Sequence, residues 1–205
     1  MSDEAPGWVA IEQVLQRVYP GQQALSWAPE VPASLGGKDK LDAIQAYASA
    51  DGAHWHLVSF GLSELYEKVS GNAEYSGWGF ELTLRAPRTA GASAPPEWTV
   101  NMLRQLGGYV FASGRPFEDG HRLDPRSPIG PDPNTKIRAL AFIRDPGLAP
   151  MQAPFGKLEF LQIVGITLDE LEAMKQSSTA QVLGLLRKTN PMLVTDPRRG
   201  SVLQA

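Results

Sequence analysis

The chain has 205 residues, of which 42% are hydrophobic, 20% are charged and none is cysteine. This composition is ordinary for a folded protein, and the length favours a single domain over residues 1–205. The lack of cysteine excludes disulfides and zinc sites with thiolate ligands. A net charge of −3, with basic residues scattered along the chain, argues against a nucleic-acid partner.

The amino terminus does not look like a targeting segment. It reads MSDEAPGWVAIEQ, with acids where a secretory signal needs basic residues before an apolar run. Nor does any window approach the roughly 20 apolar residues of a membrane-spanning helix. We therefore expect a cytoplasmic protein with no membrane partner.

The first half of the chain predicts one helix and three strands. Apolar residues recur at three- and four-residue spacing over Trp8–Tyr19, which is the period of a helix with one buried face. Alternation predicts strands over Leu41–Tyr47, His54–Phe60 and Trp78–Leu84. In the last of these, Glu81 falls on the face opposite to the apolar residues.

The middle of the chain predicts a helix followed by a long loop. The helix covers Glu97–Ser113 although Gly107 and Gly108 each lower helix propensity by about 1 kcal/mol relative to alanine. We attribute the two glycines to close packing. Segment 114–134 is rich in proline and predicts a loop without regular structure. Loops of this length are usually functional, so it is the first candidate for a functional surface.

The last third predicts two strands, two helices and a final short strand. These elements span Ile137–Ile143, Lys157–Val164, Thr167–Met174, Ala180–Arg187 and Leu193–Thr195. The first of the two helices opens with a capping box, in which Thr167 and Glu170 bond to each other's backbone. The order of elements predicts an α+β (mixed α/β) domain, with a central sheet, mostly antiparallel or mixed, packed by helices.

Several sequence blocks occur together and in one order. They are LGGKDKLDAIQAY (35–47), HWHLVSFGLSELY (54–66), SGWGFELTLR (76–85), APPEW (94–98), YVF (109–111), PFGKLEFLQIVGIT (154–167) and LVTDPRRG (193–200). In these blocks the chain closely resembles the suppressor-of-fused family. The match is to the N-terminal half of the animal members, so the chain resembles a stand-alone, bacterial member with a single suppressor-of-fused-like domain.

The resemblance implies a non-enzymatic module that binds a protein or peptide partner. Animal members are cytoplasmic regulators of Hedgehog signalling, and they grip a peptide of a zinc-finger transcription factor between two domains. With one domain, half of that clamp is absent, and a homodimer could rebuild the missing wall. Stand-alone relatives are similar to proteins proposed to be immunity proteins. An acidic chain suits the neutralisation of a basic toxin surface.

The resemblance also implies partner-binding positions. Tyr109 keeps an aromatic residue of the family, whereas His121 and Arg144 stand where the animal pattern has acids. Asp145 belongs to an Asp-Pro step that the chain retains. Replacing two acids reverses the local charge, which predicts that this chain recognises a different peptide from the animal members.

The alternative function is that of a metal-dependent hydrolase. His54 and His56 share one face of their strand, and His121 of the long loop would make a third imidazole, enough for a zinc ion with one open position. However, no sequence feature brings His121 to the strand, and histidines often make ordinary hydrogen bonds. We therefore rank a structural role first and expect neither a metal nor a cofactor.

The remaining polar residues have ordinary interpretations. Glu64, Glu67 and Glu81 are taken as surface charge rather than as an acid–base pair. The pair Arg198-Arg199 either holds a carboxylate or belongs to a solvated tail. A third mode of binding is β-augmentation, in which an edge strand accepts a peptide. The sequence does not identify the edge strand.

Overall fold

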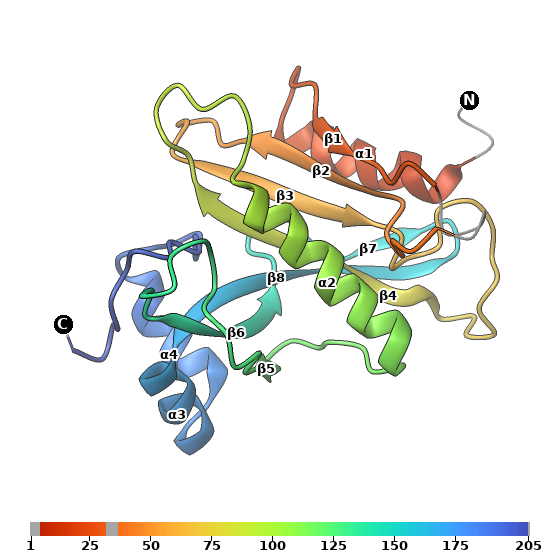
Figure 1. The fold of residues 1–205 in the computed structure, drawn as a ribbon. Helices are drawn as coiled ribbons and strands as arrows, with labels where there is room; N and C mark the ends of the chain where they lie inside the picture. Colours follow the sequence, from red (N-terminus) through yellow and green to blue (C-terminus); the bar gives the residue numbers. More distant parts are fainter. Residues whose placement is uncertain (1–4, 32–36, 205) are drawn as a thin grey trace.

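A computed structural model describes residues 5–31 and 37–204. Within these residues the chain forms four helices and eight strands (Figure 1). The helices are α1 (Pro6–Val18), α2 (Glu97–Ser113), α3 (Leu168–Gln176) and α4 (Thr179–Arg187). The strands are β1 (Leu25–Trp27), β2 (Ala43–Ala48), β3 (His54–Phe60), β4 (Tyr75–Pro87), β5 (Arg122–Leu123), β6 (Ile137–Arg144), β7 (Met151–Ala153) and β8 (Gly156–Thr167).

All eight strands belong to one mixed sheet. The order is β1-β2-β3-β4-β8-β6-β5, and β7 pairs with the first residues of β8. The central pair, β4 and β8, is parallel, whereas the other pairs are antiparallel. A parallel pair requires a crossover connection, and α2 lies in that connection (Figure 1). The predicted α+β class with a mixed sheet is therefore confirmed.

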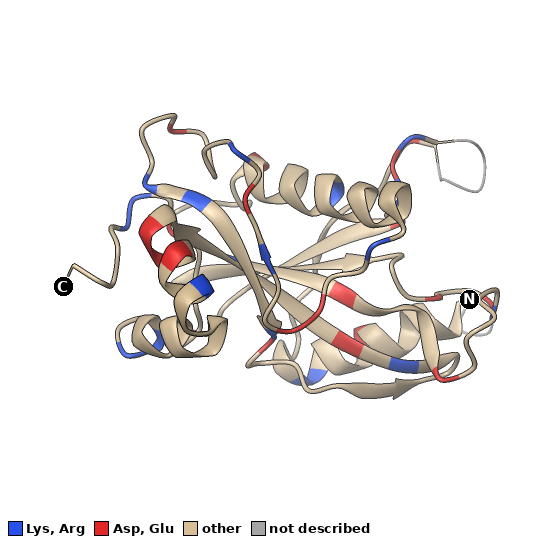
Figure 2. Ribbon diagram, turned by 90° about the horizontal axis from the view of Figure 1, so that it is seen from below, with Lys and Arg blue, Asp and Glu red and all other residues tan. Residues whose placement is uncertain are grey.

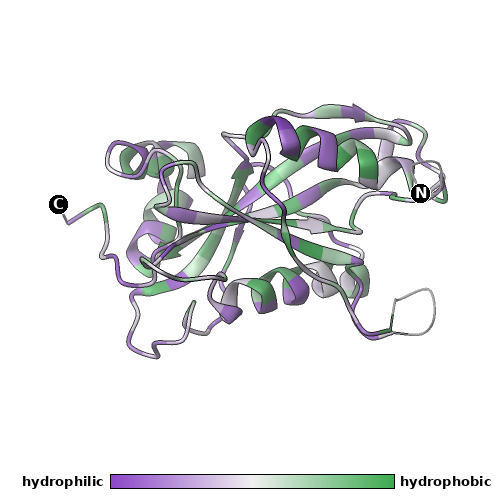
Figure 3. Cartoon of the chain, turned by 90° about the horizontal axis from the view of Figure 1, so that it is seen from above, coloured by the Kyte–Doolittle hydropathy of each residue, from purple (hydrophilic) through white to green (hydrophobic). Residues whose placement is uncertain are grey.

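Helices cover both faces of the sheet. On one face, Leu57, Leu84 and Ile163 form a hydrophobic cluster with Leu103 of α2. The opposite face carries two clusters, one with α1 at the β2–β3 side and one with α3 and α4 at the β6 side. Figure 3 shows both hydrophobic and hydrophilic positions along the helices, as expected for helices that bury one face against the sheet. Since both faces are covered, every residue of β3 is buried.

Most predicted elements agree with the structure. The strand His54–Phe60 and the helix Glu97–Ser113 have the predicted bounds. The capping box between Thr167 and Glu170 is present at the start of α3. The strands β1, β5 and β7 were missed, since two or three residues are too few to show a period. Of these, β5 lies inside segment 114–134, which is otherwise a loop as predicted.

The predicted strand over Leu193–Thr195 is wrong. Leu193 has a φ of +51°, outside the β region. The N–H of Val194 donates to Asn190 Oδ1 and its carbonyl accepts from Asn190 Nδ2, at 2.9 and 2.8 Å. A side chain thus satisfies the backbone groups that a neighbouring strand would otherwise bind.

The two glycines of α2 differ in their surroundings. A Cβ on Gly107 would lie 2.9 Å from the Cδ2 and Cγ atoms of the buried Leu41, so this helix does pack closely at Gly107. A Cβ on Gly108 would meet nothing within 4 Å. The interpretation that both glycines serve close packing therefore holds for Gly107 alone.

This difference predicts opposite responses to alanine. Gly108→Ala is expected to raise the free energy of unfolding by about 0.5–1 kcal/mol, because alanine has the higher helix propensity and no neighbour must move. Gly107→Ala should show no such gain, because Leu41 must shift. Urea unfolding of both variants measures the two effects, and an equal gain in both would contradict the close contact at Leu41.

Among the described residues, none of the helices has the length and apolar character needed to cross a membrane.

Candidate functional site

The structure separates the three histidines of the predicted metal site. His56 lies on β3 and contacts Tyr19 and Asp145, while His121 lies beyond β6, where its carbonyl accepts from Phe142 N. Two strands, β4 and β8, lie between β3 and β6, which corresponds to a separation of about 14 Å. Over residues 5–31 and 37–204, no cluster of three or more His, Cys, Asp or Glu side chains could hold a metal. The structure therefore contradicts the alternative metal site of His54, His56 and His121.

His56 instead belongs to a buried polar network on the α1 face of the sheet. At its centre Arg85, only 1% exposed, donates from Nη1 and Nη2 to the two carboxylate oxygens of Asp145, both at 2.8 Å. Asp145 Oδ2 also accepts from Thr83 Oγ1 at 2.6 Å and lies 3.0 Å from His56 Nε2. The side-chain carbonyl of Gln162 accepts from Arg85 at 2.6 Å. The buried charges are thus paired and hydrogen-bonded.

The network fixes the protonation of its members. Burial raises the pKa of Asp145, but the hydrogen bonds from His56 and Arg85 and the charge of Arg85 outweigh it and hold that pKa well below its usual range. Because a carboxylate only accepts, His56 Nε2 carries the proton. His56 Nδ1 then accepts from the Tyr19 hydroxyl at 2.7 Å. Asp145 is 5% exposed and points away from the surface that carries Arg144.

The segment after α4 forms hydrogen bonds with two members of this network. Thr195 N donates to the carbonyl of Arg85 at 2.8 Å, and Gln162 Nε2 donates to the carbonyl of Leu193 at 3.0 Å. Further on, Arg199 binds both carboxylate oxygens of the buried Glu170, at 2.6 and 2.8 Å. Of the two interpretations of the arginine pair, the carboxylate-holding one is confirmed for Arg199.

Two of the three glutamates that were interpreted as surface charge, Glu81 and Glu64, have largely buried side chains. Glu81 is 0% exposed and accepts hydrogen bonds from Ser59 Oγ and from the backbone N–H groups of Gly61 and Ser63. Burial raises its pKa to about 7, against the effect of those hydrogen bonds. Glu67 is exposed, as predicted.

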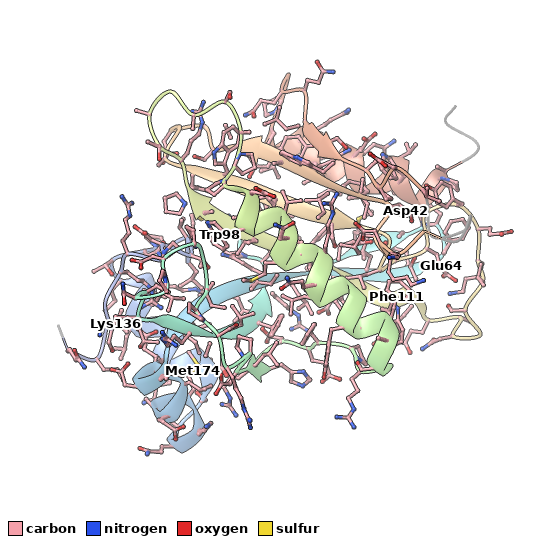
Figure 4. All side chains as sticks on the ribbon, viewed as in Figure 1. Asp42, Glu64, Trp98, Phe111, Lys136 and Met174 are labelled. Atoms are coloured by element: carbon pink, nitrogen blue, oxygen red, sulfur yellow. The ribbon has the colours of Figure 1, made fainter. Side chains whose placement is uncertain are left out.

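Glu64 holds the turn between β3 and β4 in shape. Its carboxylate accepts from the N–H groups of Val69, Ser70 and Gly77, at 2.6, 2.5 and 2.9 Å, and its side chain is 8% exposed. Burial alone would raise the pKa of Glu64, but the hydrogen bonds, from Ser70, Lys68 and Gly77 among others, lower it to about 2. Figure 4 shows Glu64 on the same side of the molecule as Phe111, at the end of α2.

The start of β4 bulges away from β8. Tyr75 pairs with Lys157 and Phe80 with Glu159, so four residues of β4 lie opposite one of β8. The bulge needs Gly77, whose φ is +56° and whose Cβ would lie 2.6 Å from the carbonyl oxygen of Leu62. Trp78 follows directly and is partly buried against the hydrophobic cluster on the α2 face.

A surface groove lies beside this bulge, and we call it the β4 groove. Its lining residues come from β4 (Tyr75, Trp78, Phe80), the loop after α2 (Phe117, Glu118, Asp119) and the ends of β6 and β8 (Arg144, Glu159). Trp78 packs edge-on against Phe111, with ring centroids 6.0 Å apart. The groove thus combines aromatic rings with charged groups.

Of the four predicted partner-binding residues, one lines the β4 groove and two contact residues that line it. Arg144 lines it, and Tyr109 stacks on the lining residue Phe117 with centroids 5.6 Å apart. His121 Nδ1 accepts from the backbone N–H of Glu118 at 3.1 Å. Asp145, by contrast, lies in the buried network. A role of these residues in partner binding stays a prediction.

Sequence reasoning missed Trp78, Glu118 and Glu159 as members of this site. Trp78 falls on the apolar face of its predicted strand, although the glycines on both sides of it could have indicated a bulge. Glu159 falls in a predicted strand and Glu118 in a predicted loop, and only the pairing of β4 with β8 brings the two together.

Comparisons with known proteins identify the family. The model of the suppressor of fused protein (SUFU) family matches residues 37–200. The human and mouse Suppressor of fused homologs are each 37% identical over 213 residues, which cover 96% of this chain and 44% of theirs. The chain belongs to the suppressor of fused family. It spans less than half the length of these two relatives.

Solved structures agree with this assignment. A chain of the Sufu–Fu complex superposes with a TM-score of 0.88 at 33% identity, covering 97% of this chain and 93% of that one. Drosophila Suppressor of Fused also gives 0.88, at 32% identity, with coverage of 98% and 52%. A homolog from Neisseria gonorrhoeae shares the fold, with a TM-score of 0.62 at 14% identity and coverage of 95% and 96%.

The buried network predicts a large difference between two neighbouring residues. Asp145→Ala is expected to lower the free energy of unfolding by about 3–5 kcal/mol, because it leaves Arg85 buried without a counter-charge. Arg144→Ala breaks only an exposed ion pair and should cost less than about 1 kcal/mol. Chemical denaturation of both variants measures this difference, and similar small losses would show that the network contributes little.

The pKa of His56 predicts a pH dependence. Burial and then the charge of Arg85 lower it to about 4, from an ordinary value of 6.5. Between these values the unfolded chain binds a proton that the native state does not, so the contribution of neutral His56 is full above pH 6.5 and declines as the pH falls towards 4. The stability advantage of the wild type over His56→Gln should shrink by about 2 kcal/mol between pH 7 and about 4.5.

Urea unfolding of the two proteins at both pH values measures this change. Taking the difference between them removes the contribution of Glu81, whose raised pKa acts in the opposite direction. A difference that stays constant with pH would mean that His56 protonates equally in both states.

Proposed function

We propose that this chain is a non-enzymatic module that binds a protein or peptide partner through the β4 groove. The observation that carries the proposal is the set of half-exposed aromatic rings at a groove of fixed shape. Tyr75, Tyr109 and Phe111 are 37%, 41% and 38% exposed, and all three lie at or beside the groove. Rigid aromatic side chains are enriched among residues that dominate binding energy.

The surroundings of the groove support a preformed site. Glu64 binds three backbone N–H groups of the turn that leads into β4, and Phe117 stacks on Phe142 of β6 with centroids 4.0 Å apart. Both walls are therefore anchored to the sheet. A site that is ordered before binding avoids part of the entropy cost of association.

The family supports the same class of function. The similar Sufu chain was solved in a complex named Sufu–Fu, so that relative assembles with another protein.

A narrower form of the proposal is a cytoplasmic immunity protein, whose acidic surface covers a basic toxin. A homodimer that closes the groove with a second copy is a separate form. β-augmentation would use β1, β5 or β7, because these strands lie at edges of the sheet.

Affinity capture from the lysate of the source organism, with mass spectrometry of the retained proteins, tests the proposal. Wild type and Tyr66→Ala, which changes an exposed aromatic residue outside the groove, should retain one common partner. Trp78→Ala and Tyr109→Ala should lose at least about tenfold of it, because truncation of an aromatic anchor costs 2 kcal/mol or more.

Thermal unfolding of all four proteins shows whether each variant remains folded. Equal retention by the four proteins would place the partner elsewhere than the β4 groove. Retention of a partner by none of them would contradict the binding module itself.

A further inference from the structure

The β4 groove carries more negative than positive charge. Its lining includes the carboxylates of Glu118, Asp119 and Glu159 and the single guanidinium of Arg144, which leaves two negative charges in excess. The Glu118 side chain is 73% exposed, and His121 Nε2 lies 3.7 Å from it. Figure 2 shows acidic positions both in the loop after α2 and near the start of β8.

Arg144 does not reverse this charge. Its Nε and Nη2 donate to the two carboxylate oxygens of Glu159, at 3.0 and 3.1 Å, so the pair is bidentate. The resemblance predicted a reversal of the local charge, because His121 and Arg144 stand where the animal pattern has acids. In the folded chain Glu159 neutralises Arg144, and the acids of the loop remain without a bidentate cation.

The aromatic residues of the groove favour the same kind of ligand. The ammonium group of Lys157 lies 5.9 Å from the ring centroid of Tyr75, so the ring face already attracts a cation. Lys157 is paired with Glu74 at 2.8 Å and therefore adds no free positive charge at the rim. Carboxylates beside exposed ring faces form a binding site for lysine or arginine.

We infer that the β4 groove selects a partner segment with a lysine or arginine side chain next to apolar residues, and that Glu118 and Asp119 determine this specificity. The inference rests on the proposed function. A cation from the partner contacts Glu118 and Asp119, while its apolar neighbours pack on Trp78 and Tyr75.

Selection from a random peptide library tests the inference. The library is selected on the immobilised full chain, and the strongest peptide is synthesised with and without its cationic residue. We expect enrichment of lysine or arginine beside apolar residues, and at least about tenfold weaker binding after Lys→Ala or Arg→Ala in the peptide. Binding should also weaken as the salt concentration rises.

Protein variants locate the effect. The double variant Glu118→Lys/Asp119→Lys should weaken binding of the peptide about 100-fold, since repulsion replaces attraction. Glu172→Lys changes an exposed glutamate of α3 outside the groove and should leave binding within about twofold. Thermal unfolding of each variant identifies any loss of fold.

The outcomes separate the inference from the proposed function. Peptides that lose binding in Trp78→Ala but carry no cation would overturn the cation specificity and keep the groove as the binding site. Peptides that bind Trp78→Ala as well as wild type, or no enriched peptide at all, would overturn both.

Discussion

The buried ion pair between Arg85 and Asp145 is the interaction on which the rest of this structure depends. Each residue alone would be a charge without water in the interior, so neither could be buried without the other. Arg85 lies on β4, Asp145 follows β6, and Gln162 on β8 completes the contacts of the guanidinium. The pair thereby ties together the strands at the parallel centre of the sheet and lies on the face that two separate hydrophobic clusters share.

The end of β6 divides this core from the binding surface. Arg144 and Asp145 are adjacent in the chain, yet one lines the β4 groove and the other lies in the network. A strand places successive side chains on opposite faces, so each residue is fixed by its neighbour. The position of Arg144 in the groove is therefore set by the burial of Asp145, which links the binding surface to the most constrained part of the fold.

The sequence predicted the long elements because their hydrophobic period is unambiguous. It could not predict that β3 is buried on both faces, and so a metal site at His54 and His56 remained as an alternative to a structural role. Glu81 was placed correctly on the second face of β4, but its burial depends on the turn after β3, where the N–H groups of Gly61 and Ser63 bind its carboxylate. The β4 groove needed the β4–β8 pairing, a contact between residues far apart in the sequence, which periodicity does not report.

The closure of the network by Thr195 has a consequence for how the protein is made. The carbonyl of Arg85 and the amide of Gln162 bind groups that follow them at a distance in the sequence, at Thr195 and Leu193. During synthesis the first strands leave the ribosome long before these residues do. A nascent chain therefore holds a charged, partly open core until residues 193–195 have been synthesised, and native folding of the sheet must wait for them.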